Sequence, residues 1–145
     1  MKTGDTHKPQ PIRLLLVDDE YDFRQAMAKR LAKRGLDCDQ AANGNECLSI
    51  LEKQSKDVVV LDVKMPGLSG IEVLRNITDT YPNTEVILLT GHATTSEGIE
   101  GIKSGAFDYL MKPVELEHLY NKILQAYDKI QRSATEEKEA EYRKQ

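Results

Sequence analysis

Short apolar runs alternate along the chain with stretches in which apolar residues recur at helical spacing. The runs are rich in Val, Ile and Leu, as is typical of strands that are buried on both faces of a sheet. We expect five strands from them, at Ile12–Val17, Leu36–Ala41, Val58–Leu61, Val86–Leu89 and Ala106–Met111. The second run is the weakest of the five.

The stretches between the runs predict five helices. The first carries Phe23 and Leu31 at helical spacing and ends at Gly35. The third begins at Ser69, with Glu72 at the spacing of a capping box. The predicted helices cover roughly residues 23–31, 47–51, 71–77, 95–103 and 115–130. Because strand and helix alternate five times with short connections, we expect an α/β fold with a parallel sheet and helices on both faces.

Length and composition fit one soluble domain. The 145 residues are 39% apolar and 30% charged, and the net charge of −4 argues weakly against direct binding to nucleic acid. No run is long enough to span a bilayer and no secretory segment opens the chain, so we expect a cytoplasmic protein with no membrane partner. Cys38 and Cys47 lack metal-ligand spacing and are interpreted as reduced thiols.

The chain divides into three parts by composition. Residues 1–10 are polar and predicted to be flexible, residues 11–131 form the domain, and residues 132–145 form a charged tail that is helical or frayed. Ile123, Tyr127, Ile130 and Ala134 make a short seam that leads into this tail. The tail is either an overrun of the last helix or a signalling helix that leads to a partner or a dimer.

Polar side chains follow four of the five predicted strands. Asp18 and Asp19 follow the first, Asp62 the third, Thr90 the fourth and Lys112 the fifth. Since ligands of such sheets bind beyond the carboxyl ends of the strands, these groups are expected to converge at one edge. Three carboxylates that repel one another suit Mg²⁺, while a lysine and a hydroxyl suit a phosphoryl group. One carboxylate is then free to act as a nucleophile and form an aspartyl phosphate.

Each of these residues also has an ordinary structural explanation. Asp18 and Asp19 fit a helix N-terminal cap equally well, Thr90 fits a turn, and Lys112 fits a solvated surface position. The hypothesis of a site therefore rests on their joint placement at four strand ends.

Four motifs resemble the receiver domain of bacterial two-component response regulators, which is CheY-like in fold. They are LLLVDDE (Leu14–Glu20), VVVLDVKMPGLSG (Val58–Gly70), VILLTGHA (Val86–Ala93) and GAFDYLMKP (Gly105–Pro113). The resemblance implies a doubly wound, five-stranded parallel sheet of strand order 2-1-3-4-5 in a three-layer sandwich.

The resemblance also implies roles for individual residues. Asp62 would be the phosphoacceptor. Asp19, Asp62 and the backbone carbonyl of Lys64 would bind Mg²⁺ directly, and Asp18 would hold it through water. Thr90 and Lys112 would grip the phosphoryl group.

Further residues are expected to serve the switch. Tyr109 would turn inward as Thr90 moves, changing the face made by the fourth helix, the fifth strand and the fifth helix. The resemblance also implies that the bond between Lys112 and Pro113 is cis, an arrangement found almost only before proline.

Two pairs of residues have two interpretations each. Lys64 and His92 either tune the lifetime of the aspartyl phosphate or are exposed spectators. Gly98 and Gly101 either make the fourth helix marginal and mobile, at about 1 kcal/mol each relative to Ala, or permit close packing.

The expected function is a phosphorelay module whose only chemistry is its own phosphorylation and slow dephosphorylation. Expected partners are a histidine kinase or phosphotransfer protein, and a downstream protein, output domain or phosphorylation-dependent second copy of the chain. The chain is either a stand-alone receiver or the excised part of a longer regulator.

Three alternatives are less consistent with the residues. A phosphatase of the haloacid-dehalogenase type needs a second acid two residues after the nucleophile, where Lys64 stands, and a cap domain. A degenerate receiver conflicts with the presence of the full set of site residues. A flavin-binding protein conflicts with the charge of Asp18 and Asp19.

Overall fold

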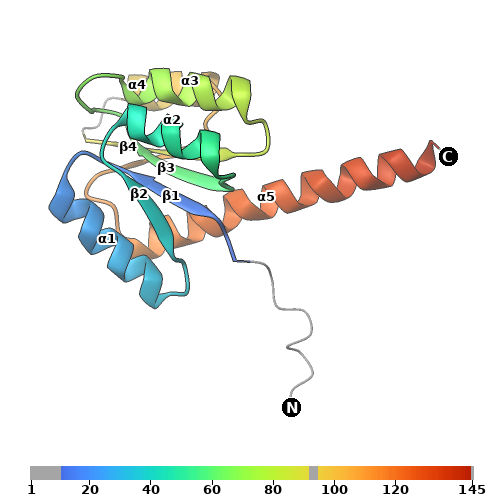
Figure 1. Cartoon of the computed structure of the whole chain (residues 1–145), viewed down its shortest axis with the longest axis horizontal. Helices are drawn as coiled ribbons and strands as arrows, with labels where there is room; N and C mark the ends of the chain where they lie inside the picture. Colours follow the sequence, from blue (N-terminus) through green and yellow to red (C-terminus); the bar gives the residue numbers. More distant parts are fainter. Residues whose placement is uncertain (1–10, 92–94, 145) are drawn as a thin grey trace, which may run out of the picture.

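The computed structural model of the chain describes residues 11–91 and 95–144, which form five parallel strands and five helices (Figure 1). The strands are β1 (Leu14–Val17), β2 (Cys38–Ala41), β3 (Val58–Asp62), β4 (Glu85–Thr90) and β5 (Asp108–Met111). The helices are α1 (Tyr21–Lys33), α2 (Gly44–Lys53), α3 (Gly70–Thr80), α4 (Thr95–Lys103) and α5 (Leu116–Arg143). The sheet order is β2-β1-β3-β4-β5, which confirms the predicted fold class and strand order.

Helices cover both faces of the sheet. In Figure 1, α1 and α5 lie on one side and α2, α3 and α4 on the other. Leu14 and Leu16 of β1 belong to the core under α1 and α5, whereas Leu15 and Val17 belong to the core on the opposite face. Because successive side chains of β1 enter opposite cores, this strand is apolar throughout instead of alternating.

Three strands begin two residues later than predicted, because the residues before them have other hydrogen-bond partners. The Arg13 N–H, which we expected in the first strand, donates to Asp57 Oδ2 at 2.8 Å. The Leu36 N–H closes the end of α1 on the Leu31 carbonyl, and the Ala106 N–H closes α4 on the Gly101 carbonyl. Periodicity alone does not distinguish these apolar cap residues from strand residues.

The predicted helix start and stop signals are confirmed where the structure tests them. The Ser69 side chain accepts from the Glu72 N–H while the Glu72 carboxylate accepts from the Ser69 N–H, which is the predicted capping box. Gly35 follows α1 with φ of +86°, a conformation that favours glycine after a helix.

The two glycines of α4 are both buried in tight contacts. A Cβ at Gly98 would lie 2.6 Å from the Tyr109 ring, and one at Gly101 would overlap the Leu88 side chain. These contacts fit the interpretation that the glycines permit close packing. The mobility of α4 stays a prediction.

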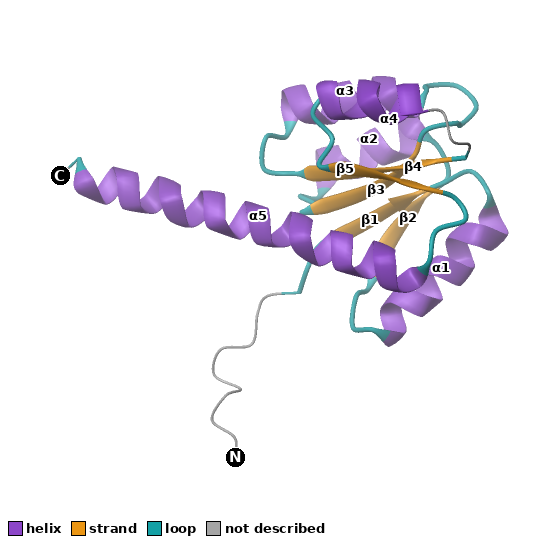
Figure 2. Cartoon of the chain, turned by 180° about the vertical axis from the view of Figure 1, so that it is seen from behind, coloured by secondary structure: helices purple, strands orange, loops and turns teal. Residues whose placement is uncertain are grey.

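Helix α5 projects well beyond the sheet (Figure 2). Ile123 is fully buried, and Tyr127 and Ile130 pack against the core, so three of the four seam residues are already used within the chain. From Gln131 to Lys144 every side chain is exposed, although the helix continues to Arg143. The described helices include none that is both long and apolar enough to cross a bilayer.

Candidate functional site

The carboxyl ends of four strands assemble the predicted site. Asp18 directly follows β1, Asp62 ends β3, Thr90 ends β4 and Lys112 directly follows β5. Because all the strands are parallel and β1, β3, β4 and β5 are neighbours in the sheet, their ends lie at one edge.

Three carboxylates form a cluster at this edge. Asp18, Asp19 and Asp62 each place one oxygen so that the three oxygens lie within 4.8 Å of one another. The residues Asp18 and Asp62 are 0% and 5% exposed, whereas Asp19 faces solvent. The cluster therefore offers two buried carboxylates and one that faces solvent. Such a set of oxygen ligands suits Mg²⁺, a hard divalent cation that keeps part of its water shell.

Lys112 is the cation of the cluster. Its Nζ lies 2.7 Å from Asp18 Oδ2, 3.3 Å from Glu20 Oε1 and 3.7 Å from Asp62 Oδ2, and 4.5 Å from the centre of the Phe23 ring. Burial by itself lowers the pKa of Lys112, but its hydrogen bond to Asp18 and the charges around it outweigh burial and raise the pKa. The ammonium group therefore stays charged, yet it is one positive charge facing several carboxylates.

The surroundings of Asp62 raise the pKa of its carboxyl group. Burial, the largest cause, and the charges of Asp18 and Asp19 together raise the pKa of Asp62, which is about 6 in the folded chain. The charge of Lys112 and a hydrogen bond from the Lys64 backbone lower the pKa, without cancelling the rise. A nucleophilic carboxylate must be ionised, so a cation beside Asp62 favours the reactive form.

Thr90 ends β4, and Tyr109 lies on the neighbouring strand β5. Thr90 is 1% exposed, and its carbonyl accepts a hydrogen bond of 2.7 Å from the Lys112 N–H. Tyr109 is partly buried, pairs in register with Leu88, and lies against Gly98 of α4. This arrangement connects the edge of the sheet to α4.

The remaining predicted residues have mixed outcomes. The Lys112–Pro113 bond is cis, as predicted. Lys64 is exposed, two residues after Asp62, and the role of its carbonyl as a ligand stays a prediction. His92 lies outside the described residues.

Three residues near the site were missed by the sequence reasoning. A Cβ at Gly70 would lie 2.6 Å from the Asp62 carbonyl oxygen, so a glycine lets α3 begin against the strand that carries Asp62. Phe23 contacts Lys112, and Arg24 donates to the Asp18 carbonyl. The helical spacing of Phe23 marked only a buried face, and no signal in the sequence distinguishes a core position from one beside a site.

A hollow of about 540 Å³ opens beside Lys112, between α1 and the segment that joins β5 to α5. Its lining residues are Glu20, Phe23, Met27, Arg30, Gly91, Lys112, Pro113 and Val114. The hollow reaches Lys112, but none of the three carboxylates lines it.

Comparison with known proteins shows the family of the chain. Residues 14–124 match the family model of the response regulator receiver domain. The response regulator MprA of Mycolicibacterium vanbaalenii is 38% identical over 109 residues, which are 75% of this chain and 47% of that protein. The DNA-binding transcriptional regulator NtrC of Salmonella typhimurium is 36% identical over 102 residues, 70% of this chain and 22% of that protein.

A solved structure shows the same fold. The CheY-like response regulator receiver domain protein from Methanospirillum hungatei superposes with a TM-score of 0.81 at 27% identity, over 86% of this chain and 99% of that one. The chain spans about half the length of MprA and 22% of NtrC. With the family model matching most of its length, the chain belongs to the response regulator receiver domain family.

Proposed function

We propose that the chain is a phospho-accepting receiver that takes a phosphoryl group onto Asp62 with Mg²⁺. The observation that carries the proposal is the convergence of Asp18, Asp19 and Asp62 with Lys112 at one sheet edge. A structural ion pair needs one carboxylate for one lysine, whereas a phosphorylation site needs an excess of negative ligands that a metal ion balances.

The chemistry assigns one task to each group. An Asp62 carboxylate oxygen attacks the phosphorus of the donor, a P–O bond forms, and the donor's leaving group departs with the electrons of the bond that breaks. Mg²⁺ at the cluster would neutralise charge on the transferring group and favour ionised Asp62. Lys112 lies close enough to both Asp18 and Asp62 to transfer its contact to a phosphoryl oxygen.

The finer assignments follow the same logic. Asp19, Asp62 and the Lys64 carbonyl are proposed as direct Mg²⁺ ligands, and Asp18 as a ligand through water. Buried Asp18 already accepts from Lys112 and from the Glu20 N–H at 2.9 Å, which supports an indirect role. Thr90 would donate to the phosphoryl group and Tyr109 would follow its movement.

The proposed partners are a histidine kinase or a phosphotransfer protein as donor, and a downstream protein or output domain as receiver of the signal. The hollow beside Lys112 would offer a donor a place to dock next to this lysine. The matching region is 47% of MprA and 22% of NtrC, both of which are named as regulators. This supports the proposal that the output domain or partner is not part of this sequence.

Labelling with a small phosphodonor tests the site. With acetyl phosphate and Mg²⁺, the wild-type chain should gain one acid-labile phosphoryl group by intact mass, with release of acetate. Asp62→Asn should abolish the gain, and exposed Asp79→Asn on α3 is the matched control that should leave it unchanged. Label retained in Asp62→Asn would overturn the assignment.

The lifetime of the phosphoryl group tests Lys64 and His92. If these side chains control access of the attacking water, Lys64→Ala and His92→Ala should change the rate of dephosphorylation by several fold without changing the labelled residue. Loss of label is followed by mass after removal of acetyl phosphate. Unchanged rates in both variants would show that the two residues are spectators.

A further inference from the structure

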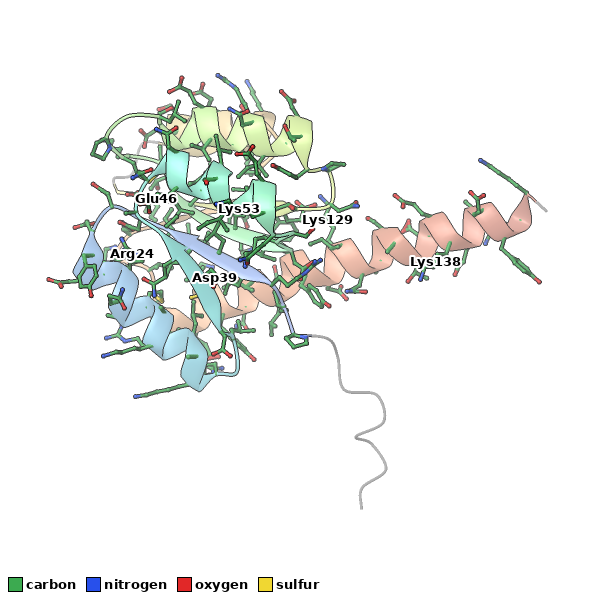
Figure 3. The ribbon with its side chains drawn as sticks, in the orientation of Figure 1. Arg24, Asp39, Glu46, Lys53, Lys129 and Lys138 are labelled. Carbon is green, nitrogen blue, oxygen red and sulfur yellow. The ribbon has the colours of Figure 1, made fainter. Side chains whose placement is uncertain are left out.

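Arg24 is a buried cation behind the acidic cluster. It lies on the first half of α1 (Figure 3), is 9% exposed, and stacks with its guanidinium 5.4 Å from the centre of the Tyr21 ring. Among the described carboxylates none pairs with it. Burying an arginine without an ion pair costs free energy. We therefore expect a role of Arg24 other than stabilising the fold.

Its hydrogen bonds go to the backbone that carries the cluster. The Arg24 Nη1 donates to the carbonyl oxygen of Asp18 at 2.7 Å, and its Nε donates to Gln40 Oε1 at 3.0 Å. Gln25 Nε2 donates to the same Gln40 oxygen at 3.0 Å. The guanidinium is therefore anchored on β2 by Gln40 and holds the chain directly after β1.

The contact with the Asp18 carbonyl acts on Asp19. The carbonyl of Asp18 and the nitrogen of Asp19 belong to one planar peptide unit, so orienting the first orients the second. Asp18 itself is held independently, because Oδ1 accepts from the Glu20 N–H and Oδ2 from Lys112. Asp19 is exposed, and among the described residues no hydrogen bond or ion pair holds its side chain. Its direction therefore depends on the peptide plane.

We propose that Arg24 is a positioning residue that fixes the Asp18–Asp19 peptide plane and thereby aims the Asp19 carboxylate at the metal site. The inference rests on the proposed function, since Asp19 matters only if the cluster binds a cation. The hydrogen bonds of the Arg24 side chain go to Gln40 and to the Asp18 carbonyl, and among the described residues none goes to a carboxylate of the cluster. Lysine cannot replace it fully, because one ammonium group does not match the two acceptors in the geometry of a guanidinium.

Mg²⁺ titration of the whole chain, followed by amide NMR shifts around residues 18–20 and 62–64, tests the inference without any phosphorylation. Arg24→Met should weaken Mg²⁺ binding by roughly tenfold or more, as loss of a partner behind metal ligands commonly does. Arg24→Lys and Gln40→Leu should weaken it by smaller factors. In metal-free protein, the Asp18 carbonyl carbon and Asp19 amide should already have shifted resonances in Arg24→Met.

Arg34→Met is the matched control. Arg34 follows the other end of α1 and also stacks on a tyrosine, with the Tyr120 ring at 4.2 Å, but it is exposed and pairs with Glu117 at 2.8 Å, away from the cluster. Its substitution should leave the Mg²⁺ affinity unchanged. Phosphorylation gives a second readout: in Arg24→Met the Mg²⁺ concentration for half-maximal labelling should rise while the rate at saturating Mg²⁺ recovers.

The outcomes separate the two proposals. If the wild type binds Mg²⁺ and takes label while Arg24→Met, Arg24→Lys and Gln40→Leu bind Mg²⁺ equally well, Arg24 has no positioning role. If the wild type binds no Mg²⁺, the proposed function fails and the inference with it. Should Arg24→Met not fold, unchanged affinity in the two milder variants overturns the inference by itself.

Discussion

At the scale of single residues, the site holds charged groups in surroundings that disfavour their charge. Asp18 and Asp62 are buried beside one lysine, and the pKa of Asp62 is raised first by burial and then by the neighbouring carboxylates. Ionisable residues with shifted pKa values are common at functional sites. Surroundings that disfavour the charge of the free protein favour a bound ligand of opposite charge.

The pH dependence of stability should report the raised pKa of Asp62. Folding raises the pKa of Asp62 from 3.8 to about 6, so between those values the folded protein binds a proton that the unfolded chain has released. The contribution of Asp62 to the free energy of unfolding therefore falls as the pH rises through this window, and the penalty is complete above about pH 6.

Asp62→Asn removes the penalty. In metal-free buffer at neutral pH we expect the variant to be more stable than the wild type by about 1 kcal/mol in urea unfolding, with the difference shrinking toward pH 4. Mg²⁺ should stabilise the wild type more than the variant. Equal stabilities of the two proteins at every pH would contradict the interpretation, and Asp79→Asn controls for loss of charge on the surface.

At the scale of elements, α4 packs closely against β4 and β5. Gly98 has no side chain where the Tyr109 ring lies, and Gly101 has none where Leu88 lies. The glycines weaken the helix by propensity but bring it onto the strands. The length of α4 was predictable from its pattern, whereas the reason for its glycines was not.

Gly98→Ala should show these opposing effects. The substitution gains about 1 kcal/mol in helix propensity, but its Cβ would overlap the Tyr109 ring, so we expect a net loss of about 1 kcal/mol in the free energy of unfolding. In a Tyr109→Ala background the overlap disappears and the same change should become stabilising. A double-mutant cycle measures the difference, and additive effects would rule out the contact as the cause.

At the scale of the whole molecule, the body and the projecting end of α5 differ in what stabilises them. Leu119, Ile123 and Ala126 are fully buried in the body, whereas the exposed stretch that carries Lys138 (Figure 3) contacts no core. Its ion pairs lie within the helix, between Arg132 and Asp128 and between Arg143 and Glu139. Such pairs support a helix only weakly.

Deletion of residues 132–145 should therefore leave the fold intact. We expect the free energy of unfolding to change by less than about 0.5 kcal/mol, while the far-UV helix signal falls in proportion to the helix removed. Ile123→Ala, which empties a buried position of the same helix, should cost about 2–4 kcal/mol and serves as the contrast. A comparable loss from the deletion would show that the projecting turns support the body.

The sequence by itself determined the fold class, the order of the elements and the set of groups at the strand ends. A strand that is buried on both faces can be recognised in the sequence, because burial requires a continuous run of apolar residues within that strand. Asp18, Asp62, Thr90 and Lys112 stand where such runs end. Only the tertiary structure decided the exact strand starts, the close contacts of Gly70 and Gly98, and the contact of Arg24 with the Asp18 carbonyl. These features depend on distances between segments far apart in the chain, and a linear pattern holds no information on which backbone atom a buried side chain will meet.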